Sequence, residues 1–387
     1  MTTARALVLA SLFGLTACGS SYVVAISEDR CGPSPGPAKP LPSLGHDPKP
    51  FELRHVPESH FGGSRPGYLY RFEREDSGTT ESLRAVHMIH GGRVLVVGDH
   101  GTALTRDVKA GWQKEDPGTT ETLYALVAAP YYKDGTVITE ELRKNKPYIA
   151  VGSKGAAVVR GLDGVWQAEQ TGTSADLFAL LHLGATTVAA GAGGVMVERS
   201  REGVWRAVKT RTTADLVGLG ICENYVCAVG AGGTMLQCAS RDGERVCIPR
   251  APATQATLRV VAEAGNIMGD GIWLRYVMPS QTEPRPPPSY TPWPEGNAVL
   301  SGEEIRAAES NHWGGISEML AVGRRSTIWF LGNGLPEKTS LEQVKLPFEV
   351  DFHDVAYELT DGFLVGDRGT IVHLAIEGFT PPHICLL

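Results

Sequence analysis

The sequence predicts an all-β fold: a seven-bladed β-propeller whose blades are four-stranded antiparallel sheets. Three observations predict it. A pattern of short apolar strands and glycine turns occurs seven times along the chain. Glycine and proline account for 71 (46 + 25) of 387 residues, about 18 % against about 12 % in an average protein, which is typical of a chain with many tight turns. A strand that the last repeat lacks is found near the N-terminus.

Each repeat has a Thr-containing turn, a first strand, a second strand that usually ends in Val-Gly, a glycine turn and a third strand. In the clearest copies a fourth strand starts at Trp. The 306 residues (387 − 81) from residue 82 to the end give about 44 per copy, which matches a four-stranded blade. The copies cover residues 78–115, 118–169, 172–208, 211–249, 256–277, 303–332 and 352–378.

Two residue types recur at fixed places in the repeats. The side chains of Trp112, Trp166 and Trp205 open fourth strands, where we expect them to fill the wedge between adjacent blades. Glycines close the second strand, where a turn needs either a positive φ or a close backbone approach. These glycines are Gly98, Gly152, Gly191, Gly230 and Gly366.

The ring is expected to close through the N-terminal part of the chain. The last repeat has no Trp-started strand after Leu374, whereas residues 68–75 match the fourth strand of the first copy. We therefore expect residues 68–75 to complete the seventh blade, which would leave no unclosed sheet stack with exposed edges.

The first 17 residues have the layout of a secretory signal peptide, with Arg5 before an apolar run from Ala6 to Ala17. The residues up to Cys18, Leu-Thr-Ala-Cys, resemble the lipobox of bacterial lipoproteins. That resemblance implies a signal peptide over 1–17, lipidation of Cys18 and a membrane partner reached through the lipid anchor. An ordinary cleaved signal is the alternative.

The segment 18–66 is rich in proline and predicts an extended tether before a propeller over 67–387. Gly19, rather than Asp, follows the lipobox cysteine, so we expect anchoring in the outer membrane of the bacterial cell envelope, facing the periplasm or the surface.

The turn before the fourth strand carries a second resemblance. Residues 162–166 read Leu-Asp-Gly-Val-Trp and residues 201–205 read Arg-Glu-Gly-Val-Trp. They resemble the degenerate Asp-box (BNR-like) propellers, including the photosystem II assembly-factor-like proteins, over about 310 residues of the chain. In that family the turn commonly reads Ser/Thr-x-Asp-x-Gly-x-Thr-Trp; the carboxylate, the glycine and the tryptophan remain here.

Six cysteines remain once Cys18 is assigned to the lipid, an even number in an oxidising compartment. We expect the disulfides to be Cys222–Cys227, Cys238–Cys247 and Cys31–Cys385. The repeat alignment places Arg245 where other copies have Trp, so the missing wedge residue coincides with two disulfides. A four-cysteine zinc site is the alternative, but its spacing does not fit a zinc knuckle, so no metal is expected.

The formal net charge of −7 is spread along the chain and predicts no nucleic-acid partner. No P-loop, dinucleotide-binding, HExxH or GxSxG motif is found, so we expect no cofactor and favour a non-enzymatic protein. His353 and Asp354 are neighbours in a first strand and point to opposite faces, which favours a structural histidine.

A glycan-acting, sialidase-like hydrolase with its active site in the axial channel is the competing hypothesis. Sialidases use an arginine cluster together with a Tyr nucleophile and an acidic partner. Arg84, Arg259 and Arg306 occupy comparable first-strand positions. The hypothesis requires them to converge with paired carboxylates on the axis, within about 10 Å.

The favoured expectation is an envelope-anchored, non-catalytic scaffold that binds an unknown protein or envelope polymer through one loop-rich face. Residues 128–147, 279–296 and 311–315 elaborate the connections between first and second and between third and fourth strands, which open on the same face. Exposed aromatic side chains there are the predicted binding anchors. They are Tyr131, Tyr132, Tyr290, Trp293 and Trp313.

Overall fold

The computed structural model describes residues 51–377 with short gaps. The gaps are 56–67, 90–92, 108–109, 130–146, 223, 242, 251–253, 263–264, 278–288, 312–317, 333–340 and 359–360. Cys18, Cys31, Cys385, Tyr131, Tyr132 and Trp313 lie outside the described residues.

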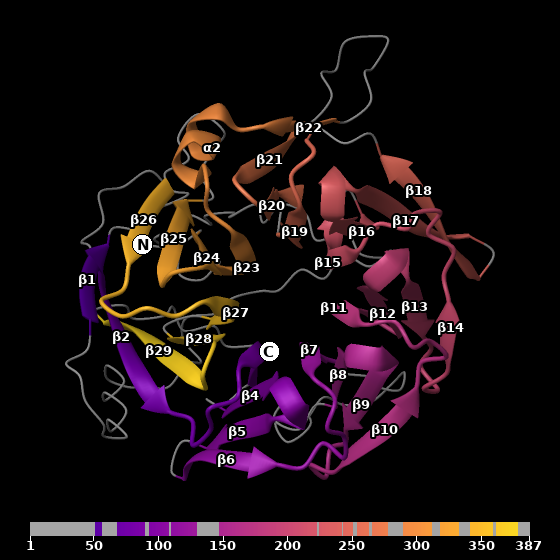
Figure 1. Cartoon of the computed structure of the whole chain (residues 1–387), viewed down its shortest axis with the longest axis horizontal. Coiled ribbons are helices and arrows are strands. Elements are labelled where there is room, and N and C mark those ends of the chain that lie inside the picture. Colours follow the sequence, from indigo (N-terminus) through magenta and orange to yellow (C-terminus); the bar gives the residue numbers. More distant parts are fainter. Residues whose placement is uncertain are drawn as a thin grey trace, which may run out of the picture. The chain divides into compact units, whose positions relative to one another are not determined.

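Seven antiparallel sheets form a closed ring of blades (Figure 1). Blade 1 consists of β3(Leu83–Ile89), β4(Arg93–Gly98), β5(Ala103–Asp107) and β6(Gly111–Glu115), and blade 2 of β7(Leu123–Ala128), β8(Tyr148–Gly152), β9(Ala156–Arg160) and β10(Trp166–Gln170). Blade 3 consists of β11(Leu177–Leu183), β12(Thr186–Gly191), β13(Met196–Arg199) and β14(Trp205–Ala207), and blade 4 of β15(Leu216–Cys222), β16(Tyr225–Gly230), β17(Met235–Arg241) and β18(Glu244–Arg250). Blades 5 to 7 are β19(Leu258–Val261), β20(Ile267–Gly269), β21(Ile272–Val277), β22(Ser289–Pro292); β23(Ile305–Asn311), β24(Glu318–Gly323), β25(Thr327–Gly332), β26(Leu341–Lys345); and β27(Phe352–Glu358), β28(Asp361–Gly366), β29(Thr370–Glu377), β2(Tyr68–Asp76). A short helix, α2(Pro294–Leu300), connects blades 5 and 6.

The predicted closure is confirmed: β2 pairs antiparallel with β29, from Leu69 opposite Glu377 to Asp76 opposite Thr370. An unpredicted strand, β1(Phe51–His55), adds to the outer edge of β2. The sequence analysis placed these residues in the tether, and this part of the prediction was wrong. The side chains of Phe51 and Leu53 alternate with polar ones and pack against the core between blades 6 and 7, which outweighs the flanking prolines.

The core is divided into one apolar cluster per blade interface. Trp166, for example, packs in a cluster of blade 1 and blade 2 side chains, and Trp205 in the next one. Both indoles are nearly buried, at 9 % and 8 % exposed. The wedge-filling role predicted for these tryptophans is confirmed, and the blades are held to their neighbours by side-chain packing all round the ring.

Glycines end the second strands because of a close approach. At Gly191 the backbone is extended, with φ at −167°. A Cβ there would lie 1.8 Å from the carbonyl oxygen of Asp176, and Gly230 meets Asp215 in the same way. Of the two reasons predicted, the close backbone approach is therefore the correct one.

The disulfides predicted within blade 4, Cys222–Cys227 and Cys238–Cys247, are both present. Cys247 lies opposite Cys238, the register in which Trp112 lies opposite Arg106 in blade 1. The residue in the tryptophan position of blade 4 is therefore Cys247, and the alignment of Arg245 with that position was wrong. A tight β17–β18 hairpin extends the strands by a cross-strand pair from Arg241 to Glu244.

Within the described residues, no helix is long and apolar enough to cross a membrane.

Candidate binding site at the axial mouth

Every first strand has a bulge directly after its first residue, which leaves one side chain outside the regular ladder. The first strands surround the centre of the ring (Figure 1). Since the bulge follows the first residue of each of them, the seven residues lie at the same end of the first strands, around the axis. We call this set the axial mouth. Its members, in blade order, are Arg84, Tyr124, Phe178, Val217, Arg259, Arg306 and His353.

The mouth has two chemically different halves. Blades 5, 6, 7 and 1 contribute Arg259, Arg306, His353 and Arg84, whereas blades 2, 3 and 4 contribute the uncharged Tyr124, Phe178 and Val217. All seven residues are half-buried. A ligand at this end of the axis would therefore meet guanidinium groups on one side and an apolar surface on the other.

In the charged half, each arginine is fixed by carboxylates. The guanidinium of Arg84 donates from Nε and Nη2 to the two oxygens of Asp99, at 2.8 Å each. The hydrogen bond to Asp99 raises the pKa of Arg84, so the group stays charged. In blade 5, Arg259 donates to Asp270 in the same manner, at 2.7 and 3.2 Å.

Carboxylates also join neighbouring blades. Glu304 accepts from Nε of Arg306 at 2.8 Å and lies 3.5 Å from Nη2 of Arg259 in blade 5. Asp351, from blade 7, accepts from Nη2 of Arg306 at 3.4 Å. The charged half is thus one continuous chain of ion pairs across blade boundaries.

His353 completes this chain between two arginines. Its Nδ1 lies 3.1 Å from Nη1 of Arg306, and its Nε2 lies 3.0 Å from Nη1 of Arg84 and 2.6 Å from Oδ1 of Asp367. Burial lowers the pKa of His353, and the positive charges of Arg84 and Arg306 lower it further against the opposing hydrogen bond to Asp367. The imidazole is therefore neutral at pH 7.

We call the charged half with its partners the axial arc. It contains three arginines and His353 together with Asp99, Asp270, Glu304, Asp351 and Asp367. With five carboxylates against three guanidinium groups, the arc carries no excess positive charge. Its arginines are held rigidly, which suits orientation of a ligand more than bulk electrostatic attraction.

The apolar half is formed by two aromatic rings bordered by turns with short side chains. The rings of Tyr124 and Phe178 are in edge-to-face contact, with centroids 5.5 Å apart. The adjacent turns of blades 3 and 4 both read Ala-Gly-Gly, at 192–194 and 231–233, whereas the equivalent turns of blades 1 and 2 carry His100 and Lys154. Short side chains in these turns leave the aromatic rings accessible to an extended ligand.

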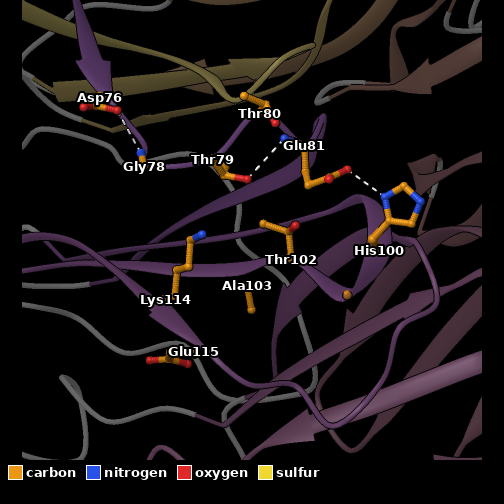
Figure 2. A pocket seen from close by; sticks show the side chains of 11 residues that line it. Asp76, Gly78, Thr79, Thr80, Glu81, His100, Thr102, Ala103, Lys114 and Glu115 are labelled. Atoms are coloured by element: carbon orange, nitrogen blue, oxygen red, sulfur yellow. Dashed lines mark hydrogen bonds and ion pairs between the residues drawn. The ribbon is translucent and has the colours of Figure 1, made fainter.

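A hollow of about 650 Å³ lies outside the mouth, between the turn 76–81 and the turn 100–103 (Figure 2). In its lining, Nδ1 of His100 lies 2.7 Å from Oε2 of Glu81. A hollow lined by equivalent turns of blade 3 has nearly the same size. Since it repeats with the blades, this hollow follows from the repeat geometry and is a weaker candidate site than the asymmetric mouth.

The convergence required by the hydrolase hypothesis is observed in part. Arg84, Arg259 and Arg306 do belong to one arc with carboxylates. One tyrosine, Tyr124, does lie in the mouth, where burial and the nearby charge of Asp176 raise its pKa. Another tyrosine–acid cluster is buried: Tyr70 and Tyr357 donate to Glu318 at 3.1 and 3.2 Å inside the interface of blades 6 and 7. Glu318 pairs with Asn311 at the far end of β23 from Arg306, about 17 Å away at the usual strand rise.

Two of the predicted aromatic anchors belong to the packing of blade 5. The ring of Trp293 meets that of Trp273 edge-to-face at 4.5 Å, and the guanidinium of Arg275 lies 4.1 Å from its centroid. Tyr290 packs against Tyr276 at 5.6 Å. Both Trp293 and Tyr290 are half-buried rather than exposed, because the chain after the proline-rich loop returns to the sheet as β22; their role as binding anchors stays a prediction.

Four members of the mouth were noted from the sequence, the three arginines and His353, the last as a structural residue; Tyr124, Phe178 and Val217 were missed. The available signal was the residue that follows the first apolar residue of each first strand, which reads Arg, Tyr, Phe, Val, Arg, Arg and His in the seven copies. His353 and Asp354 do point apart, as predicted. The partner of His353 is Asp367, while Asp354 accepts a hydrogen bond from the backbone of Val86, at 2.9 Å.

Fold and site together define a seven-bladed β-propeller with an asymmetric axial mouth. No protein-family model and no curated protein matches the sequence. Among solved structures, the chain is similar to virginiamycin B lyase from Staphylococcus aureus, with 8 % identity and a TM-score of 0.59 over 79 % of this chain and 99 % of that one. It is also similar to YCF48 from Cyanidioschyzon merolae, with 11 % identity and a TM-score of 0.54 over 79 % and 98 %.

A structure described as YCF48 bound to D1 peptide is similar too, with 13 % identity and a TM-score of 0.55 over 79 % of this chain and 94 % of that one. At such low identities these likenesses establish the propeller fold alone.

Proposed function

We propose that this protein is an envelope-anchored, non-catalytic propeller scaffold that binds a segment of a protein or envelope polymer at the axial mouth. The observation that carries the proposal is the asymmetry of the mouth: seven equivalent positions divide into a rigid charged arc and a low aromatic half. Arginine beside aromatic rings is the composition typical of binding hot spots. Groups held in place before binding lose little entropy when a ligand arrives.

Two further points support a binding role. The propeller of YCF48 has been captured with a peptide, so a ring of this architecture can serve as a peptide receptor. The lipobox-like sequence at Cys18 would place the propeller in the envelope, at the end of a proline-rich tether. A tethered propeller would present its mouth to partners near the membrane.

This proposal moves the binding surface predicted from the sequence. The loop-rich face lies at the opposite ends of the first strands from the mouth. Tyr131, Tyr132 and Trp313 on that face are outside the described residues, and Tyr290 and Trp293 have packing roles. The mouth is the surface on which the described side chains combine charge, apolar area and accessibility.

Site-directed photo-crosslinking in native envelopes tests the proposal. A photoreactive phenylalanine analogue at Phe178 is expected to give a discrete adduct, whereas the same analogue at Leu162, which is 52 % exposed on an outer turn, is expected to give none. Adding Tyr124→Ser should suppress the adduct, and adding Val204→Ser, on another outer turn, should not. Equal adducts at 178 and 162, or none at 178, would contradict binding at the mouth.

A glycan-acting hydrolase is a second candidate, favoured by the convergence of arginines and carboxylates in the arc. The guanidinium edges already paired with carboxylates weigh against it. A panel of sialosides and other glycosides incubated with the purified chain distinguishes the two functions. Turnover that is lost in Arg306→Ala and kept in Arg206→Ala, on the exposed outer strand, would favour the hydrolase over the scaffold.

A further inference from the structure

Two guanidinium groups of the axial arc flank one imidazole. Nη1 of Arg84 and Nη1 of Arg306 approach the imidazole of His353 from two sides, at 3.0 and 3.1 Å. The opposite edges of both guanidinium groups are already occupied by carboxylates, Asp99 on one side and Glu304 with Asp351 on the other. The Nη1 ends therefore face the imidazole and not their own ion-pair partners.

A neutral imidazole cannot form a hydrogen bond with all three groups around it, which are Arg84, Arg306 and Asp367. Oδ1 of Asp367 lies 2.6 Å from Nε2 of His353. The neutral ring therefore carries its proton on Nε2 and donates a hydrogen bond from there to the carboxylate. Nδ1 can then accept from Arg306. Nε2 cannot accept from Arg84 at the same time, and among the described residues no oxygen accepts from Nη1 of Arg84. One guanidinium donor at the mouth thus lacks an acceptor, which is uncommon for a half-buried charged group.

A second proton on His353 would change the arrangement. It would sit on Nδ1 and face Nη1 of Arg306 at 3.1 Å, so that three positively charged donors would converge. Burial and the two arginines hold the pKa of His353 down for this reason. A negatively charged acceptor at the point of convergence would remove the repulsion and take up all three donors.

We propose that an oxyanion, a carboxylate or a sulfate group, binds where Arg84, Arg306 and His353 meet, and that His353 takes up a proton as it binds. The charged groups that face His353 are Arg84 from β3, Arg306 from β23 and Asp367 after β28; Asp99, Glu304 and Asp351 lie behind the arginines. This inference rests on the proposed function in placing a ligand at the mouth, and it adds the chemistry of the ligand and its dependence on pH.

Calorimetric titration of the full chain with sodium sulfate, at constant ionic strength maintained with chloride, tests the inference. Linkage to one proton predicts binding about tenfold tighter at pH 5.5 than at pH 7.5. Repeating the titration in buffers with different ionisation enthalpies should show uptake of about one proton per sulfate at the higher pH. Equal affinity at the two pH values, or no proton uptake, would overturn the inference.

Variants locate the proton. His353→Asn cannot be protonated and should abolish the pH dependence of sulfate binding. His100→Asn is the matched control, because His100 also titrates but lies exposed on an outer turn beside Glu81; it should leave the pH dependence unchanged. If His353→Asn does not fold, the proton count on the unmodified chain still decides.

Acetate in place of sulfate distinguishes a carboxylate ligand from a sulfate ligand. These titrations use no partner, so they can fail while crosslinking at Phe178 succeeds. In that case the oxyanion site falls and the proposed function stands.

Discussion

Blades 1 to 3 and blade 4 join their outer strands to the preceding blade by different chemistry. At the 7/1 interface, Glu75 of β2 accepts two hydrogen bonds from Arg106, at 2.9 and 2.8 Å, and one from the indole of Trp112, at 2.6 Å. The same glutamate–arginine–tryptophan triad recurs at the next two interfaces, built on Glu115 and on Glu169. Each triad connects the fourth strand of one blade to the third and fourth strands of the next.

At the interface of blades 3 and 4 the triad is absent, and a different ion pair joins the two blades: Arg245 of β18 donates from Nε and Nη2 to Glu198 of β13. Val208 replaces the glutamate, and the disulfide of Cys238 and Cys247 occupies the registers of the arginine and the tryptophan. Val208 and both cysteines pack in one apolar cluster. The members change together because a buried carboxylate without its arginine, or the reverse, would leave an uncompensated charge at a cost of several kcal/mol.

The comparison indicates that the triad between two blades can be replaced by an apolar cluster, another ion pair and a disulfide within blade 4. Four changes would break or sharpen this interpretation.

The largest effect is expected from Glu75→Ala. It leaves the Arg106 guanidinium, about 4 % exposed, and the Trp112 indole without their acceptor at the interface that closes the ring. We expect a loss of about 3–5 kcal/mol in the free energy of unfolding, measured by urea denaturation. Glu202→Ala, on an exposed outer turn, is the control; a similar change in both variants would show that the triad is not a special link.

The next largest effect is expected from removal of the Cys238–Cys247 disulfide in blade 4. Cys238→Ser with Cys247→Ser opens a short cross-linked loop, with a sequence separation of 9 residues. The chain-entropy relation gives a loss of about 2–3 kcal/mol. The same measurement on the unmodified chain in reductant, which also opens Cys222–Cys227, should give a loss at least as large. An unchanged free energy of unfolding in both experiments would contradict a stabilising role for this disulfide.

Replacing the blade 4 disulfide by the glutamate–arginine–tryptophan triad tests the comparison directly. Val208→Glu with Cys238→Arg and Cys247→Trp should install the triad in blade 4. We expect it to recover roughly 1 kcal/mol relative to the double serine variant, since the net gain of a buried, hydrogen-bonded ion pair is smaller than the penalty of breaking one. Denaturation of the two variants at the same pH checks this. A triple variant less stable than the serine variant would show that the two links are not interchangeable.

The last effect depends on pH and concerns a second carboxylate at the 7/1 interface. Burial raises the pKa of Asp354 to about 7, against about 3.9 in an unfolded chain. The folded state therefore holds the proton more tightly, so this group stabilises the fold at low pH and loses that contribution as pH rises from about 4 to about 7.

Asp354→Asn removes this dependence while keeping an oxygen for the amide of Val86. The melting temperature of the variant relative to the unmodified chain should rise steadily between pH 4 and pH 7 and level off above it. The same substitution at Asp163, on an exposed turn, should give no such slope. A constant difference across the range would contradict the raised pKa.

The repeat-based part of the fold could be predicted because it depends on local chemistry. Turn glycines and apolar alternation recur along the copies and wedge tryptophans in three of them, so several weak signals reinforce one another. The strand β1 escaped this reasoning because it belongs to no repeat. Its apolar residues gain a place only when β2 has already closed the ring.

The candidate site was predictable in part. Comparable positions in the repeats indicated Arg84, Arg259 and Arg306, and their convergence follows from the closed ring. The exposure expected for Tyr290 and Trp293 was wrong because composition does not tell whether a side chain after a loop returns to the sheet. Burial there is decided by Trp273, Arg275 and Tyr276 on the neighbouring strand.

By itself, the sequence determined the number of blades, the strand that closes them and the two disulfides of blade 4, since each depends on residues close together in the chain or on a repeated pattern. The tertiary structure alone decided that the bulge residues of seven distant segments meet around one axis, and that His353 lies between Arg84 and Arg306. The physical reason is closure: residues such as Arg84 and His353, which are 269 positions apart, become neighbours only when the last blade packs against the first.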